Sequence, residues 1–178
     1  MKVRPALFIF GAAFISAGCN SPNEEGFEEH NTFFDIPTFF EQEIITLKKN
    51  NPLVLKTVYT DDFSEQKKVH LSDWAIELSP FTNVDLNTPA YQGFIHKDSL
   101  AGKVEYTFTN DKLDLKKITI LYQEKEPIAF EIEKITKNFL YETTEKLTYK
   151  KDIMYDIQKN QKVILMDENK YRITGQMN

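Results

Sequence analysis

The chain has 178 residues, of which 41% are hydrophobic and 28% charged, and its formal net charge is −5. This is an ordinary globular composition, which excludes collagen, coiled coils and wholly disordered chains. The length suggests one domain with a sizeable core. An acidic chain without a basic stripe argues against nucleic acid as a partner and against the binding of bare anionic lipid headgroups.

Residues 1–18 have the layout of a secretory signal peptide. Lys2 and Arg4 give a basic start, Pro5 to Ile15 form an apolar stretch, and small residues follow at 16–18. The stretch is too short to favour a membrane span, although a short signal anchor is the alternative. Removal of these residues would leave 20 basic residues against 27 acidic ones, a net charge of −7.

The sequence Ser16-Ala17-Gly18-Cys19 resembles a bacterial lipobox, with Ser16 at the position where an aliphatic residue is usual. The resemblance implies that Cys19 is acylated and becomes the new N-terminus. Several acyl chains would anchor the protein stably, because each buried methylene contributes about 0.8 kcal/mol. Cys19 is the only cysteine, so we expect no disulfide, no thiolate metal site and no thiol nucleophile.

Residues 19–32 are expected to form the lipidated cysteine and an acidic tether. The segment from Asn20 to Asn31 contains four glutamates with Pro22 and Gly26, a composition that cannot bury much surface. Asn23-Glu24-Glu25 resembles the surface-export signal of Bacteroidota lipoproteins. We therefore expect a lipid-anchored protein of the outer membrane, and the sequence leaves a periplasmic and a surface-facing orientation both open.

Residues 33–178 are expected to form a single α+β domain that begins with a helix. Asp35-Ile36-Pro37 is typical of a helix start, with a capping acid and a proline in the first turn. Ile36, Phe40, Ile44 and Leu47 follow on one helical face. Asn50-Asn51-Pro52 ends the helix.

The next segment predicts a β-hairpin and then a second helix. Leu53 to Thr60 reads as a strand, residues 61–64 as a turn, and Glu65 to Leu71 as the returning strand. Ser72 is expected to cap a short helix that places Trp74, Leu78 and Phe81 on one side, with Trp74 as its core anchor. A polar loop is predicted from Asn83 to Pro89.

From Tyr91 onward, apolar and polar residues alternate with period two, as in strands with one buried and one wet face. The alternating pairs and triplets are Val104/Tyr106/Phe108, Ile118/Ile120/Tyr122, Ile128/Phe130/Ile132, Phe139/Tyr141, Leu147/Tyr149, Tyr155/Ile157, Val163/Leu165 and Tyr171/Ile173. We predict a curved antiparallel β-sheet of about seven to nine strands, packed on one or two N-terminal helices.

The sequence contains few candidates for catalytic or metal chemistry. His30, His70 and His96 lie far apart without ligand spacing, so solvated or packed histidines are favoured over ligands. Glu131 and Glu133 share a strand face as two acids of a hydrolase would, but the wet side of an amphipathic strand explains them better. Two acidic clusters, Asp61-Asp62 and Asp111 to Asp114, lack the EF-hand pattern of a calcium site and fit hairpin turns.

Tyrosine is the remaining signal. All eight tyrosines lie on or beside predicted strands, and a β core with its rim explains most of them. The functional alternative is a groove for an apolar or glycan ligand, with hydroxyl groups at its mouth.

The segments FFDIPTFFEQEI, LSDWAIEL, NVDLNTPAY and KYRITGQ resemble an uncharacterised family of Bacteroidota lipoproteins over about residues 33–176. The resemblance implies a location in the cell envelope and no particular activity. A looser likeness, of architecture alone, is to the Lol-type lipoprotein carriers, whose half-barrel sheets enclose acyl chains.

These observations lead us to expect a non-catalytic, membrane-anchored envelope lipoprotein that binds a protein partner or a hydrophobic ligand through its sheet. The alternatives are a structural accessory subunit of an outer-membrane complex and a carboxylate-dependent hydrolase. We expect no cofactor and no metal, and assign no ligand-binding residue.

Overall fold

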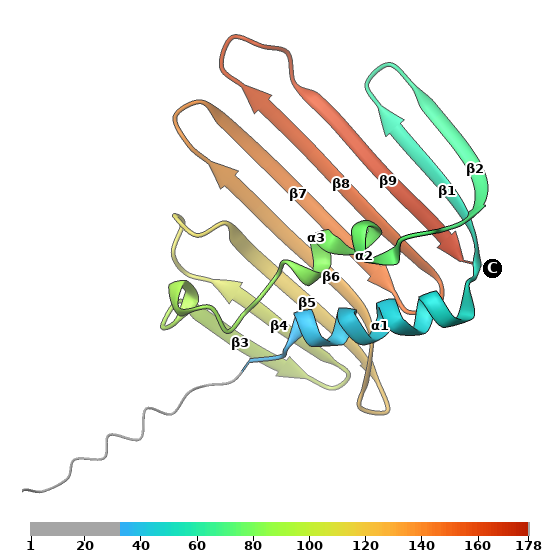
Figure 1. The fold of residues 1–178 in the computed structure, drawn as a ribbon. Coiled ribbons are helices and arrows are strands. Elements are labelled where there is room, and N and C mark those ends of the chain that lie inside the picture. Colours follow the sequence, from blue (N-terminus) through green and yellow to red (C-terminus); the bar gives the residue numbers. More distant parts are fainter. Residues whose placement is uncertain (1–32, 178) are drawn as a thin grey trace, which may run out of the picture. The chain divides into compact units, whose positions relative to one another are not determined.

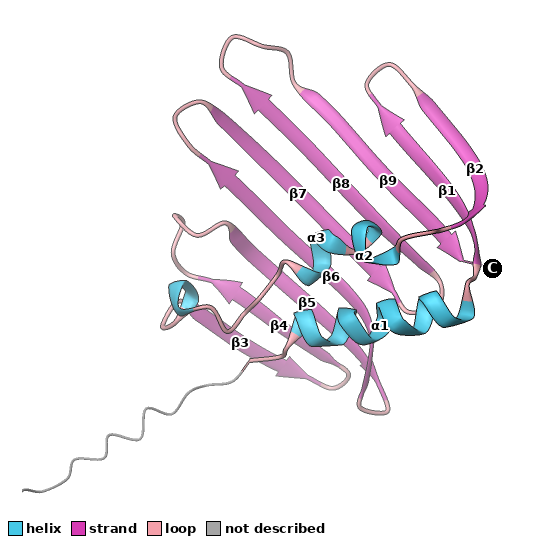
Figure 2. Ribbon diagram, viewed as in Figure 1, coloured by secondary structure: helices cyan, strands magenta, loops and turns pink. Residues whose placement is uncertain are grey.

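A computed structural model describes residues 33–177, which belong to one compact unit. The predicted signal peptide, the lipidation site at Cys19, His30 and the tether lie outside the described residues. The fold is α+β, with one open antiparallel sheet of nine strands and its helices on one face (Figures 1 and 2). The upper limit of the predicted strand number is therefore confirmed.

The elements follow one another as helix, hairpin, short helices and a long meander. They are α1 (Ile36–Asn50), β1 (Leu53–Thr60), β2 (Ser64–His70), α2 (Trp74–Glu77), α3 (Ser79–Thr82), a 3₁₀ turn η1 (Pro89–Tyr91), β3 (Ile95–Leu100), β4 (Lys103–Phe108), β5 (Leu115–Gln123), β6 (Glu126–Lys137), β7 (Tyr141–Lys150), β8 (Met154–Val163) and β9 (Asn169–Met177).

The strand order is β2-β1-β9-β8-β7-β6-β5-β4-β3. Strands β3 to β9 form a meander in which each strand pairs with its neighbour in sequence, as predicted. The N-terminal hairpin joins the sheet beside β9, with Val58 opposite Ile173. This places the first and last strands of the domain side by side (Figure 1).

Helix α1 begins where the sequence predicts. Asp35 accepts hydrogen bonds from the backbone N–H of Thr38 at 2.9 Å and from its hydroxyl group at 2.8 Å, which satisfies an otherwise unpaired N-terminal donor. Asn51 ends the helix in the left-handed conformation, with its N–H donating to Leu47. The predicted apolar face is buried against the sheet, together with Glu43.

The second helix differs from the prediction. Asp73, not Ser72, caps α2, because its carboxylate accepts hydrogen bonds from the N–H groups of Ala75 and Ile76. Pro80 cannot donate a backbone hydrogen bond, and the segment divides into α2 and α3. Trp74 is buried as predicted.

The loop after α3 is less polar in its contacts than predicted. Val84 and Leu86 are both buried in the core. The alternation had also placed Phe139 and Leu165 on strands, whereas both lie in exposed turns, Phe139 between β6 and β7 and Leu165 between β8 and β9.

The core between helices and sheet is dominated by aromatic rings. Phe40 of α1 stacks on Phe81 with 4.8 Å between ring centroids, and it lies 5.1 Å from Phe130 and 5.0 Å from Tyr149 of the sheet. All four rings are buried. They fill the space between helices and sheet at this position.

Two buried tyrosines fasten the helices to the sheet. The Tyr149 hydroxyl donates to Glu43 of α1 at 2.7 Å, and the Tyr155 hydroxyl donates to Glu77 of α2 at 2.6 Å. A lysine neutralises each carboxylate, Lys151 at 3.3 Å and Lys56 at 2.7 Å respectively. Burial and then the hydrogen bond to the carboxylate raise the pKa of both tyrosines far above the ordinary value.

Candidate functional site

The sheet face opposite the helices does not form part of the core. Within residues 33–177, no helix covers this face (Figure 2). Because side chains alternate along a strand, the burial of Tyr155 and Ile157 against the helices places Asp156 and Gln158 on the open face. We call this surface the open face.

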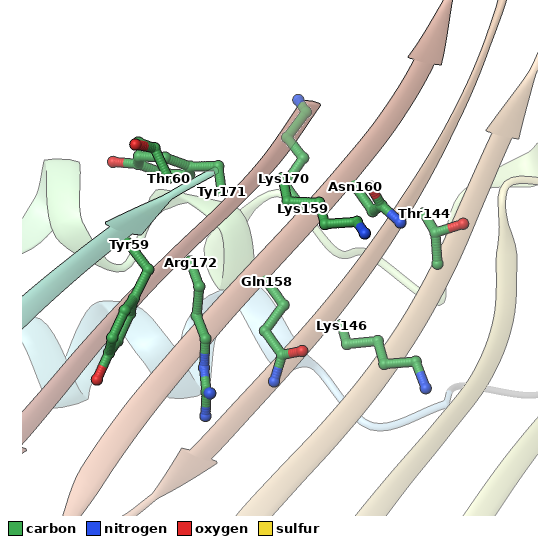
Figure 3. A pocket seen from close by; sticks show the side chains of 10 residues that line it. All are labelled: Tyr59, Thr60, Thr144, Lys146, Gln158, Lys159, Asn160, Lys170, Tyr171 and Arg172. Atoms are coloured by element: carbon green, nitrogen blue, oxygen red, sulfur yellow. The ribbon is translucent and has the colours of Figure 1, made fainter. Parts of the chain in front are cut away.

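Strand register brings four polar side chains of the open face into one row. Tyr59 of β1 lies opposite Arg172 of β9, Arg172 opposite Gln158 of β8, and Gln158 opposite Lys146 of β7. Figure 3 shows these side chains projecting next to one another from neighbouring strands. Directly opposed residues in a sheet are close enough to act on one ligand.

The row borders a hollow of about 320 Å³, which is near the lower end for a small-molecule site. Its lining comprises Tyr59, Thr60, Thr144, Lys146, Gln158, Lys159, Asn160, Lys170, Tyr171 and Arg172 (Figure 3). The ten residues include four cations and no carboxylate. We call it the basic hollow after these four cations, of which Arg172, Lys159 and Lys170 pair with carboxylates beside the hollow.

Arg172 is held rigidly at the centre of the row. Its Nε and Nη2 donate to the two oxygens of Asp156 at 3.0 and 2.6 Å, and Gln158 donates to the same carboxylate at 3.2 Å. The guanidinium carbon lies 5.9 Å from the centroid of the Tyr59 ring, within cation–π distance. The hydrogen bond to Asp156 raises the pKa of Arg172, a side chain that is charged at physiological pH in any case.

Lys146 differs from the other lysines of the hollow. Lys159 pairs with Glu145 at 3.3 Å and Lys170 with Glu168 at 3.6 Å. Lys146 is exposed and belongs to none of the ion pairs found within residues 33–177. Glu133 of β6 lies opposite Lys146 without forming an ion pair with it, so the ammonium group is available to an anionic ligand or an acidic side chain of a partner.

A second hollow, of about 300 Å³, lies on the open face between β4, β5 and β6. Glu131 and Glu133 line it, together with lysines of β4 and β5. Both glutamates are exposed, whereas a general acid needs a dry environment to stay protonated at neutral pH. The structure thus brings the predicted pair to one hollow without the surroundings that acid catalysis requires.

Both lysines of this second hollow form salt bridges with Glu105. Glu105 contacts Lys103 at 2.6 Å and Lys117 at 3.1 Å. The hydrogen bonds from these two lysines lower the pKa of Glu105, which stays ionised and paired. This arrangement has the character of a solvated, charge-balanced strand surface.

The remaining candidates of the sequence have structural surroundings. His70 lies at the end of β2 with Nδ1 2.9 Å from the Asn51 carbonyl oxygen, and His96 is exposed on β3. Asp61 lies in the β1–β2 turn and accepts a hydrogen bond from the Lys170 N–H at 2.8 Å. Within residues 33–177, no three His, Cys, Asp or Glu side chains gather in a way that could hold a metal ion.

Asp114 also has a structural partner. It accepts a hydrogen bond from the Tyr91 hydroxyl at 2.7 Å. Burial alone would raise the pKa of Asp114, but that bond and the charge of Lys134 outweigh it and lower the pKa. Both predicted turn interpretations of the acidic clusters agree with these positions.

The tyrosines divide between core and open surface. Tyr106, Tyr149 and Tyr155 are buried, as the core interpretation predicts. Tyr59 and Tyr171 instead line the basic hollow. Sequence reasoning missed Lys146, Gln158 and Arg172, because alternation assigns them to a wet face without showing which strands are neighbours.

Comparisons with known proteins identified no relative of this chain. No protein-family model matches the chain, and searches of curated proteins and of solved structures found no match either. Among the described helices, none combines the length and the apolar character needed to cross a bilayer.

Proposed function

We propose that this protein is a non-catalytic envelope lipoprotein, anchored in the outer membrane through Cys19, that binds an acidic segment of a partner protein on its open face. The observation that carries the proposal is the basic hollow, with Tyr59, Lys146, Lys170 and Arg172 on a sheet face left free by the helices. Lys146, which belongs to none of the ion pairs found within residues 33–177, favours an acidic group of a partner on this face.

The contacts within the hollow support binding rather than catalysis. Asp156 is engaged by Arg172 and Gln158, so it is not free to transfer protons. The lining supplies cations, amide groups and an aromatic ring, which bind and orient a ligand. Nothing in this set activates a nucleophile.

The filled core favours a protein partner over a hydrophobic ligand. In a carrier, the ligand would lie between helices and sheet, where Phe40, Phe81, Phe130 and Tyr149 pack together. An acyl chain would have to displace these rings. The free surface of the domain lies on the opposite, polar side of the sheet.

The binding proposal is tested by photo-cross-linking in cells. A photo-reactive amino acid at Gln158 should cross-link a defined partner, whereas the same residue at exposed Glu41 of α1 should not. Adding the charge reversal Lys146→Glu should lower the yield about tenfold, because like charges across an interface are costly. The matched control, Lys48→Glu on α1, should leave the yield unchanged. Equal yields from both positions, or equal loss from both reversals, would reject the proposal.

The anchoring proposal has its own test. Cells fed a labelled fatty acid should attach the label to the wild-type protein and not to a Cys19→Ala variant. The variant should also leave the membrane fraction for the soluble envelope fraction. Labelling of the Cys19→Ala variant would refute anchoring at this residue and would leave the binding experiment unaffected.

A further inference from the structure

At one end of the strands, two exposed turns carry large apolar side chains. The β6–β7 turn presents Phe139 and Leu140, and the β8–β9 turn presents Ile164, Leu165 and Met166. Leu165 is 99% exposed and Phe139 is 88% exposed, so neither contributes to the core. We call these five residues the apolar tip.

The two turns of the apolar tip form one continuous surface. Strands β7 and β8 are paired, with Tyr141 opposite Val163. The pairing continues into the turns, where the Ile164 N–H donates to the Leu140 carbonyl oxygen at 3.0 Å. Both hairpins extend past the helices at the same edge of the sheet (Figure 1). Five neighbouring apolar side chains therefore face solvent together, which marks an interaction site.

The backbone at Leu165 is a second unusual feature of the apolar tip. Leu165 has a φ of 64°, in the left-handed region that favours glycine or asparagine. A leucine in this conformation is unfavourable, and its exposed side chain contributes no core packing that would offset the cost. Strain of this kind is typical of functional positions.

We propose that the apolar tip inserts into the interface of a phospholipid bilayer. The two most exposed side chains belong to hairpin turns that project past the helices (Figure 1), an arrangement that soft lipid accommodates and that a folded protein would have to match with a pocket. Apolar side chains inserted into the headgroup region are a common mode of peripheral binding. Insertion of these apolar side chains requires no polar group of the bilayer as a hydrogen-bond partner.

The charges beside the apolar tip balance one another. Lys137 flanks one turn and Lys162 the other, and Glu142 lies opposite both and pairs with Lys137 at 2.8 Å. Asp167 and Glu168 directly follow Met166, and Glu168 pairs with Lys170 at 3.6 Å. Because carboxylates are as numerous as lysines here, insertion would be driven by the apolar side chains rather than by attraction to anionic headgroups.

The length of the preceding chain makes this contact possible on the membrane that holds the anchor. Residues 20–32 would span at most about 45 Å when extended, whereas the ten residues of β8 span about 34 Å. A domain anchored at Cys19 therefore has enough chain to turn its sheet edge towards the bilayer. This reach rests on the proposed anchoring, but insertion of the tip does not.

The experiment uses the chain from Asn20 onward, which lacks Cys19 and so cannot be acylated, and which contains the whole compact unit. It is floated with vesicles of phosphatidylethanolamine and phosphatidylglycerol. The wild-type chain should float, and Phe139→Ser with Leu165→Ser should weaken partitioning about tenfold or more. The matched control, Ile76→Ser with Leu100→Ser, removes two exposed apolar side chains elsewhere and should change it less than about twofold.

A further variant separates binding from folding. Leu165→Gly relieves the left-handed strain, so its melting temperature should equal or exceed that of the wild type while its vesicle binding falls. Failure of the wild-type chain to float, equal loss in the two double variants, or unchanged binding of Leu165→Gly would overturn the proposal. A photo-cross-link from Leu165 to a protein in cells, without vesicle binding, would assign the tip to a protein partner instead.

Discussion

Replacement of Tyr149 by phenylalanine tests how the first helix is held on the sheet. The change removes the hydroxyl that donates to Glu43 at 2.7 Å and keeps the ring that packs on Phe40 at 5.0 Å and Phe81 at 6.0 Å. No cavity is created, so the loss is that of one hydrogen bond to a buried, charged acceptor. Lys151 at 3.3 Å still neutralises the carboxylate.

A hydrogen bond to a charged group contributes about 1.5–3 kcal/mol, so Tyr149→Phe should lower the free energy of unfolding by about 2 kcal/mol. For a domain of this size, that corresponds to a fall in melting temperature of about 4–8 °C. Urea unfolding followed by circular dichroism and a thermal scan measure the two quantities. Both should report a single cooperative transition.

The matched control is Tyr141→Phe on the same strand, whose hydroxyl makes no hydrogen bond within residues 33–177. It should change stability by less than about 0.5 kcal/mol. A double-mutant cycle with Glu43→Gln should give a coupling energy of about 1 kcal/mol or more. Equal effects of the two tyrosine substitutions, or no coupling to Glu43, would refute the role assigned to this contact.

Three further predictions follow from buried or capped groups. The pKa of Tyr149 and Tyr155 is raised above the ordinary value of 10 in the folded state. Both states are protonated below pH 10, so stability is unaffected there. Above it only the unfolded state loses these protons, and the free energy of unfolding should fall by up to about 2.7 kcal/mol per pH unit for the pair. Gly175→Ala should destabilise by about 3 kcal/mol, because the added Cβ would overlap the Tyr155 ring. Asp35→Ala should cost about 1 kcal/mol through loss of the cap on Thr38.

Chemical denaturation at a series of pH values checks the first of these predictions, and an unchanged midpoint between about pH 9 and about pH 11 would contradict it. Thermal unfolding checks the other two. A Gly175→Ala protein as stable as the wild type would mean that the Tyr155 ring is free to move. Wild-type stability after Asp35→Ala would mean that solvent replaces the cap.

Several local features of this domain could be read from the sequence because their causes are local. The cap at Asp35, the apolar face of α1 and the turn at Asp61 depend on residues within one or two turns of chain, and the structure has them as predicted. Period-two alternation likewise assigned Ile118, Ile120, Phe130 and Ile132 to the buried face, where they lie.

The failures of sequence reasoning concern groups whose surroundings are distant in the chain. A glutamate in a helix is expected to face solvent. The burial of Glu43 is explained by its contact with Tyr149, which lies 106 positions away in the chain. Alternation assigned Phe139 and Leu165 to short strands. It could not show that the chain reverses there, because turns are set by pairing as well as by residue type.

By itself, the sequence determined where the first helix begins and ends, which residues of most strands face the core, and that one antiparallel sheet packs on N-terminal helices. Only the tertiary structure decided that β1 lies beside β9, which brings Tyr59 to Arg172 and forms the basic hollow. Helix caps and alternation act between near neighbours, whereas the pairing of β1 with β9 depends on burial and hydrogen bonding across more than a hundred residues. Contacts at that separation are selected by the whole core, and no local pattern encodes them.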